Sequence, residues 1–145
     1  NVLMDLTCFD PQDFYQRFPQ LKAVCSTLLS HNKKCEAHAK PGFESGLQLL
    51  QEAGLTPVPT TFLTTGFVVA RTLAVIINEA FYAWEEKTAT KEDIDRAMRF
   101  GVNYPLGPFA WAKGREPVVV RLLEALLTET KDERYKPAAS LKALK

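Results

Sequence analysis

The composition of this chain changes at Phe62, and this change limits its fold more than any single motif does. Beyond it, residues 66–86 contain no proline and are apolar nearly all round the helical repeat. A helix that is apolar on all sides is normally the buried centre of a bundle. Residues 61–145 are therefore predicted to form an all-helical domain.

End signals place the first two helices of this domain. Thr65 is the predicted N-cap of the long apolar helix, which is expected to run from about residue 66 to residue 86. Thr90 and Asp93 form a capping-box pattern, and Gly101 closes the helix that follows it.

The last part of the chain combines a rigid loop with two more helices. Pro117 suits the first turn of a helix over 117–130, and a short helix is expected over 138–144. Residues 103–108 contain two prolines and a glycine, and are predicted to be a loop because they cannot be helical. This loop resembles the rigid wall of an acyl pocket, and a simple corner between helices explains it equally well.

The first sixty residues alternate between short elements instead. Residues 30–41 are polar and are predicted to be a loop, and the two prolines of the last segment indicate an edge strand or a linker. The expected elements are a strand over 2–7, a helix over 10–18, a strand over 22–29, a helix over 41–53 and an extended segment over 56–62. This order is typical of an α/β unit, but it is too short to be a complete one.

The length of the chain fits this division. A dinucleotide-binding domain joined to a substrate domain needs about 250 to 300 residues, whereas this chain has 145. The prediction is a mainly α chain, with an incomplete α/β segment over 1–60 before a helical domain over 61–145. Because the chain begins at Asn1 and not at Met, sequence upstream is expected to have been removed.

Charge and cysteine content exclude several classes of protein. Eighteen basic and seventeen acidic residues give a net charge of +1 without a basic cluster, so nucleic acid is not an expected partner. The three cysteines, Cys8, Cys25 and Cys35, match no zinc-ligand spacing, and their odd number argues against a disulfide framework. They are expected to be idle thiols in a reducing compartment.

No membrane segment is expected. Residues 1–9 lack the basic start of a signal peptide, and polar residues interrupt the most apolar stretch, 66–84. A cytoplasmic protein is the prediction.

The chain contains no nucleotide-binding glycine motif. Neither G-x-G-x-x-G nor a P-loop occurs, so NAD is not expected to bind this chain in the usual way. The two histidines, His31 and His38, are most simply solvated loop residues. A nucleophilic site assembled from Cys25, Ser26 and His31 is not favoured by any spacing.

Glu79 stands out inside the long apolar helix. A buried carboxylate must be paired or hydrogen-bonded, so Glu79 is predicted to be either a structural anchor or a site residue. Arg71, two turns earlier on the same helix, is a candidate partner.

Several blocks of the second half carry a family resemblance. The runs Gly66–Arg71, Asn78–Ala80, Thr90–Asp95 and Gly101–Phe109 occur in the order found in the C-terminal domain of 3-hydroxyacyl-CoA dehydrogenases, and residues 132–137 resemble the end of that domain. The resemblance covers roughly 60–144. Residues 47–59 also resemble the last helix and strand of the family's Rossmann domain.

The resemblance implies a division of labour. In the family, a Rossmann domain binds NAD and carries a catalytic His–Glu pair, while the helical domain closes over the acyl-CoA and commonly forms a dimer. The motif that holds the His–Glu pair is absent from this sequence. Residues 1–60 are thus expected to be an incomplete Rossmann-like segment, and 61–145 a helical substrate and dimerisation domain.

The resemblance also implies which residues contact substrate. The family places an Asn before the Arg of the Gly-Phe motif to hold the substrate carbonyl, whereas this chain has an alanine there, which removes the hydrogen-bond donor. No catalytic, cofactor-binding or metal-binding residue is assigned. The residues implied to bind substrate are Ala70, Arg71, Tyr104, Pro105, Gly107 and Phe109.

Two functions remain open. The first is a divergent or truncated 3-hydroxyacyl-CoA dehydrogenase-like protein of fatty acid metabolism, inactive as this chain, from a family that oxidises 3-hydroxyacyl-CoA with NAD. The alternative is a non-enzymatic helical module for dimerisation or acyl-CoA binding. Either implies a homodimer through the helical domain, with acyl-CoA as the candidate ligand and no NAD in this chain.

Overall fold

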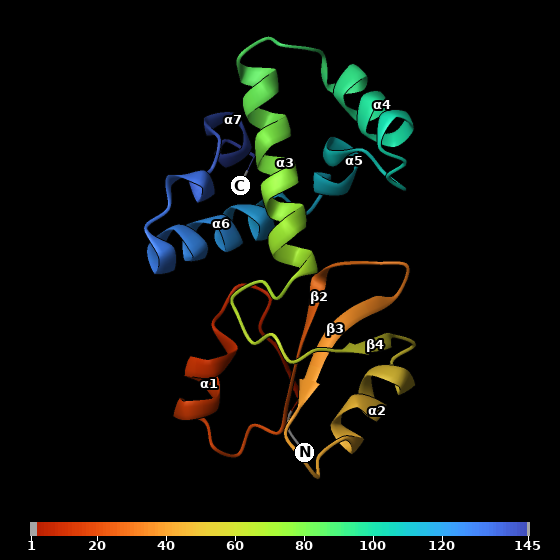
Figure 1. Cartoon of the computed structure of the whole chain (residues 1–145), viewed down its shortest axis with the longest axis vertical. Coiled ribbons are helices and arrows are strands. Elements are labelled where there is room, and N and C mark those ends of the chain that lie inside the picture. The colour runs from red at the N-terminus through yellow and green to blue at the C-terminus, as the bar shows by residue number, and fades with distance from the viewer. Residues whose placement is uncertain (1–2, 145) are drawn as a thin grey trace. The chain divides into compact units, whose positions relative to one another are not determined.

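The chain divides into two compact units, Asn1–Arg71 and Thr72–Lys145 (Figure 1). The computed structural model describes residues 3–144, with the backbone alone at Ser30 and His31. The predicted boundary at residue 60 lies inside the first unit. The expected class, a small α/β segment before a helical domain, is confirmed.

The first unit is built on a sheet of four strands in the order β1-β2-β3-β4. β1 and β2 are parallel, β2 and β3 are antiparallel, and β3 and β4 are parallel. The strands are β1 (Leu3–Asp5), β2 (Ala23–His31), β3 (Lys34–Ala39) and β4 (Thr56–Pro59).

The prediction of a loop over residues 30–41 is wrong, because β3 lies there. β2 and β3 form a hairpin in which Asn32 and Lys33 make the turn, with φ angles of 52° and 61°. A two-residue hairpin turn of this kind needs positive φ at both positions, for which Asn-Gly is the usual signal. Lysine in the second position hides that signal.

Two helices cover opposite faces of this sheet. Val24 and Cys25 are neighbours in β2, so their side chains point to opposite faces. Val24 belongs to the cluster that includes Phe14 of α1 (Pro11–Arg17), and Cys25 belongs to the cluster that includes Leu50 of α2 (Ser45–Glu52). The predicted cap of the first helix is confirmed, since the Asp10 carboxylate accepts the N–H of Gln12 at 2.8 Å.

β4 is an edge strand, as its prolines indicate. Thr56 donates its N–H to Lys33 of the neighbouring chain segment, and Thr60 donates to Ala37 in β3. Pro57 and Pro59 occupy the positions between these donors.

The long helix α3 (Val69–Glu85) begins later than its sequence predicts. Gly66 and Phe67 have φ angles of 79° and 51°, so both residues adopt left-handed backbone that cannot start an α-helix. Thr65 is therefore not the N-cap. The carboxylate of Glu36, distant in sequence, accepts the first N–H groups of the helix instead.

The second unit contains the rest of α3, from Thr72 onward, and the shorter helices. The predicted helices over 117–130 and near residue 140 are confirmed, and the helix after Thr90 is capped by that threonine as expected. The remaining elements are α4 (Lys91–Gly101), α5 (Pro108–Ala112), α6 (Glu116–Thr130), the 3-10 turn η1 (Glu133–Tyr135) and α7 (Ala139–Lys142).

The prediction for the loop is correct over residues 103–107 and wrong at Pro108. Pro108 opens the short helix α5, where a proline lacks only an N–H that the first helical turn leaves unpaired.

The polar anchor inside α3 is Asn78 and not Glu79. Asn78 is fully buried; its amide donates to the carbonyl of Lys136 at 2.8 Å and accepts the N–H of Ala138 at 2.9 Å. Glu79 is exposed, so the prediction of a buried carboxylate there is wrong. Within residues 3–144, no helix combines the length and hydropathy needed to cross a bilayer.

Candidate functional site

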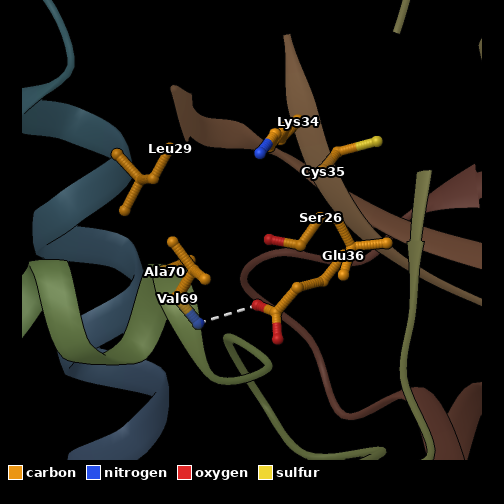
Figure 2. A pocket seen from close by; sticks show the side chains of 8 residues that line it. Ser26, Leu29, Lys34, Cys35, Glu36, Val69 and Ala70 are labelled. Carbon is orange, nitrogen blue, oxygen red and sulfur yellow. Dashed lines mark hydrogen bonds between the residues drawn. The ribbon is translucent and has the colours of Figure 1, made fainter. Parts of the chain in front are cut away.

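A cavity of about 240 Å³ opens in the first unit beside the start of α3 (Figure 2). Strands β2, β3 and β4 supply most of its wall, and the first residues of α3 supply the rest. Its lining residues are Ser26, Leu29, Lys34, Cys35, Glu36, Val58, Val69 and Ala70. The cavity thus combines apolar walls with an ammonium, a hydroxyl and a carboxylate.

The carboxylate of Glu36 is held by the backbone of the neighbouring segment. Glu36 is 9% exposed, and it accepts the N–H of Val69 at 2.7 Å and that of Val68 at 3.1 Å. Negative charge is favourable at a helix N-terminus, where unpaired N–H groups converge. Figure 2 shows the carboxylate turned toward Val69. Its charge therefore stabilises the start of α3.

The hydroxyl of Ser26 is fixed by a chain of hydrogen bonds. The Thr7 hydroxyl donates its proton to Asp5 at 2.7 Å, and the Ser26 oxygen lies 3.1 Å from that hydroxyl. A hydroxyl has one proton to give, so Thr7 must accept from Ser26. Asp5 in turn accepts from the N–H of Thr27 at 2.7 Å and from its hydroxyl. Ser26 can consequently only accept a hydrogen bond from a ligand in the cavity.

Ser26 and Glu36 face each other across the hairpin, because the register of β2 and β3 pairs these two residues directly. Neither residue is among the binding residues that the sequence predicts. The signal that would have found them is the hairpin itself, since pairing residues 23–26 with 36–39 brings both side chains to one place. A loop predicted over residues 30–41 contains no such strand pairing, so the prediction misses both residues.

The thiols at this sheet are poor nucleophiles. Burial, with the nearby charge of Asp5 and the neighbouring Cys35, raises the pKa of Cys25 to about 12. Burial and Asp5 also raise the pKa of Cys35. The thiolate is the reactive form of cysteine, so both residues are expected to be inert thiols, which agrees with the prediction from the sequence.

His38 is not among the residues that line the cavity. His38 lies in β3 and is half-buried, so the prediction of a solvated loop histidine is wrong for it. Its Nδ1 is 3.0 Å from the hydroxyl of Tyr15, and burial raises the pKa of Tyr15 to about 12. Burial and the charge of Lys40 lower the pKa of His38. The side chain of His31 lies outside the described residues.

Of the residues implied to bind substrate, Ala70 and Arg71 belong to the first unit. Ala70 is 2% exposed and presents its methyl group to the cavity. Arg71 is half-buried and is the last residue of the first unit. Its backbone N–H donates to the carbonyl of Gly66.

The other four implied residues lie together at the start of α5 in the second unit. The ring of Tyr104 packs on Trp111 with centroids 5.6 Å apart. Gly107 is buried against an α4 side chain, and Pro105 is exposed. Phe109 packs on Phe81 with centroids 4.8 Å apart.

A second, apolar groove of about 310 Å³ lies between α3 and α4 within the second unit. Its lining residues are Val75, Ile76, Glu79, Ala80, Ala83, Ile94, Met98 and Pro108. At the end of α4, Phe100 is 76% exposed and Val102 is 55% exposed.

Metal chemistry finds no support in the part of the chain that the structure describes. Among residues 3–144, no three His, Cys, Asp or Glu side chains lie close enough together to hold a metal ion.

Comparison with known proteins gives one consistent result. The family model for the 3-hydroxyacyl-CoA dehydrogenase C-terminal domain matches residues 66–144. The chain is 47% identical over 78 residues to 3-hydroxyadipyl-CoA dehydrogenase of Escherichia coli K12, covering 53% of this chain and 16% of that protein. It is 36% identical over 99 residues to 3-hydroxybutyryl-CoA dehydrogenase of Clostridioides difficile, covering 67% of this chain and 34% of that protein.

A solved structure extends the likeness to both units. The crystal structure of 3-hydroxybutyryl-CoA dehydrogenase from Escherichia coli K12 matches 98% of this chain and 31% of its own, with a TM-score of 0.82 and 31% identity. The chain therefore spans about a third or less of the length of these relatives.

Proposed function

Because the chain belongs to the 3-hydroxyacyl-CoA dehydrogenase family, we propose that it binds acyl-CoA without itself transferring a hydride. The observation that carries the proposal is the cavity beside Ala70. Its apolar walls suit an acyl chain, and its polar groups are an ammonium, a fixed hydroxyl acceptor and a carboxylate that is already bonded.

The cavity is suited to hold only part of a ligand. Ligand pockets commonly measure about 300 to 1,000 Å³, whereas this cavity is about 240 Å³. We therefore place the acyl end of the thioester there, with Leu29, Val58 and Val69 as its walls. The exposed Lys34 at the rim faces the polar part of the ligand.

The carboxylate at the cavity has a structural role. A general base must have a lone pair within hydrogen-bond reach of the proton it removes. The Glu36 carboxylate accepts two N–H groups at the α3 start, and Ala70 offers only a methyl group. We therefore expect binding without turnover.

NAD, the cofactor of the family, does not fit the described residues. A dinucleotide site sets its pyrophosphate at a glycine-rich turn before a helix N-terminus. The connection from β1 to α1 contains no glycine, and the Asp10 carboxylate already occupies the N-terminus of α1. A phosphate placed there would meet a like charge.

Titration of the protein with acetoacetyl-CoA in a calorimeter tests the proposal, together with an assay of NADH oxidation. We expect saturable binding, no binding of equal strength by CoA alone, and no turnover above the blank. Lys34→Met should weaken binding by about threefold, the effect of one exposed charge pair. Lys33→Met, which removes a neighbouring exposed charge in the turn, is the matched control. Measurable NADH oxidation would refute the proposal.

The groove of the second unit supports a second role, assembly. We propose that a second copy of this chain covers the groove between α3 and α4, because its lining is apolar apart from Glu79. Light scattering at tens of micromolar should give twice the 16.3 kDa mass of the chain. Met98→Glu should yield monomers, while Arg96→Glu on the exposed side of α4 should not. A wild-type monomer would contradict this role.

A further inference from the structure

Three polar side chains line the cavity of the first unit, and they differ in the hydrogen bonds that they can still make. Lys34 is exposed and carries an ammonium, which only donates. Ser26 is 5% exposed and Glu36 is 9% exposed, so neighbouring protein groups fix the bonds of both. The two buried groups therefore decide which kind of ligand atom can lie beside them.

The proton of Ser26 is committed within the protein. The hydroxyl of Thr7 donates its own proton to Asp5 at 2.7 Å, so its 3.1 Å contact with Ser26 uses the proton of Ser26. What remains for the cavity is a pair of acceptor sites on the Ser26 oxygen. Figure 2 shows this oxygen turned toward the side of the cavity that Leu29 and Ala70 form.

Asp5 keeps the Thr7 hydroxyl in this orientation. Its carboxylate accepts the N–H of Thr7 at 2.9 Å, the N–H of Thr27 at 2.7 Å and the hydroxyls of both threonines. Turning the Thr7 proton toward Ser26 breaks a bond to a carboxylate, which is stronger than a bond between neutral groups. Turning the Ser26 proton toward a ligand leaves the buried Thr7 oxygen without its donor. Ser26 is thus held as an acceptor.

Glu36 adds a second acceptor at the same place. The strand register pairs it directly with Ser26 across the hairpin. Its Oε2 accepts the N–H of Val69 at 2.7 Å, whereas its Oε1 has only a 3.2 Å contact with the N–H of Val68. An ionised carboxylate only accepts hydrogen bonds. Any ligand atom placed between Ser26 and Glu36 therefore faces two acceptors.

Proton donors lie elsewhere on the wall. Among the eight described lining residues, Lys34 and Cys35 carry the other side-chain protons that can be donated. Cys35 packs with Leu50 on the opposite face of the sheet, and Figure 2 shows its sulfur turned away from Ser26. The proposed function assigns Lys34 to the polar part of the ligand. The surroundings of Ser26 thus favour a ligand group that donates.

This arrangement distinguishes a hydroxyl from a ketone. A hydroxyl donates its proton to Ser26, whereas a ketone oxygen only accepts and would be desolvated beside two acceptors. Sites built around such a bond discriminate because a mismatched ligand leaves buried polar groups unpaired. We propose that Ser26 is a specificity-determining residue, which makes the cavity favour an acyl group with a hydroxyl over the same group with a ketone. This inference rests on the proposed function, which places the acyl end in this cavity.

The test compares two thioesters that differ in the oxidation state of one carbon. Dissociation constants of acetoacetyl-CoA and of each enantiomer of 3-hydroxybutyryl-CoA are measured by calorimetry with the full chain. The tighter-binding enantiomer should bind about tenfold more tightly than acetoacetyl-CoA, the effect of one buried hydrogen bond. Ser26→Ala removes the acceptor and should reduce this ratio to about twofold or less by weakening the hydroxy thioester.

Thr7→Val tests the direction of the Ser26 proton. It removes the oxygen that accepts this proton, so the Ser26 hydroxyl becomes able to donate to a ketone. Acetoacetyl-CoA should then bind about threefold to tenfold more tightly, while the constants of the hydroxy thioesters stay close to the wild-type values. The matched control is Thr27→Val, which removes the other threonine hydroxyl bound to Asp5 and keeps the Thr7 oxygen. It should keep the wild-type ratio.

The outcomes separate this inference from the function beneath it. If the wild type binds none of these thioesters, the proposed function fails and the inference fails with it. If the wild type binds the hydroxy and keto thioesters equally, or if Thr7→Val keeps the wild-type ratio, the inference alone is overturned. A merely structural role of Ser26 lowers the folded fraction of Ser26→Ala, scales all the affinities alike and leaves their ratio unchanged, which also overturns it.

Discussion

The two units each bury a polar side chain that bonds the backbone of a distant segment, but they surround it differently. In the first unit, Glu36 holds the start of α3 beside an open cavity. In the second unit, Asn78 holds the segment at Lys136 and Ala138 and is 0% exposed. The first arrangement leaves room for a ligand, and the second leaves none.

This difference teaches how to separate a site from a structural anchor when both are buried and polar. A sealed group must find all its partners within the protein, because an unpaired buried donor or acceptor destabilises the fold. A group at a cavity can exchange protein partners for water or ligand. Replacing the sealed residue should therefore have the larger effect on stability.

Asn78→Ala gives the largest expected effect. It leaves the carbonyl of Lys136 and the N–H of Ala138 without their buried partner, and the free energy of unfolding should fall by about 2 to 4 kcal/mol. Denaturant unfolding followed by circular dichroism measures this. Tyr82→Phe removes another donor to the same Lys136 carbonyl and should lower the free energy by less than about 1 kcal/mol. If Asn78→Ala and Tyr82→Phe lowered the free energy of unfolding equally, the sealed position of Asn78 would add nothing to the effect of its loss.

Glu36→Gln should have an intermediate effect. The amide keeps one oxygen for the N–H groups of Val68 and Val69 but loses the charge, which should lower the free energy of unfolding by about 1 kcal/mol. The control is Glu44→Gln, an exposed carboxylate that accepts the N–H of Gly42 at 3.1 Å. That change should stay within about 0.5 kcal/mol. If Glu36→Gln lowered the free energy of unfolding as much as Asn78→Ala does, water in the cavity would not be replacing the lost hydrogen bonds.

His38 should give the smallest effect, and a pH-dependent one. Burial and Lys40 lower the pKa of His38 below its ordinary 6.5, so the folded state favours the neutral ring. The contribution of the neutral His38 ring to the free energy of unfolding is fully present above pH 6.5. It is lost as the pH falls through 6.5 toward the lowered pKa.

Unfolding measured between about pH 8 and about pH 5 checks this prediction at His38. His38→Gln should remove that part of the pH dependence. Lys40→Met should reduce it, because the pKa of His38 then moves back toward 6.5. A wild-type profile in both variants would assign the pH dependence to other groups.

The sequence predicts the helical unit better than the sheet. Thr90, Pro117 and the apolar periodicity of α6 are local signals, and each marks a helix that the structure contains. The hairpin of β2 and β3 depends on two positive φ angles at Asn32 and Lys33, and only Asn32 is a residue typical of such a turn. Residues at the helix ends therefore predict these helices, whereas no run of neighbouring residues predicts the hairpin.

The candidate site shows the same limit. The family blocks identify Ala70 as a residue to examine, and the structure places it in the wall of the cavity. Ser26 and Glu36 reach that cavity through strand register, and Asn78 rather than Glu79 points inward through the phase of α3. A shift of one position on a helix turns a side chain by about 100°, which composition cannot resolve.

The prolines of β4 have a consequence for how the sheet can grow. Thr56 and Thr60 donate inward to the chain segment beside them, so the positions between them that alternate outward are Pro57 and Pro59. Neither has an N–H. This margin can accept hydrogen bonds but has no donor at these two positions, so a strand from another molecule cannot complete a ladder along it. The two prolines therefore act against the stacking of copies edge to edge through β4.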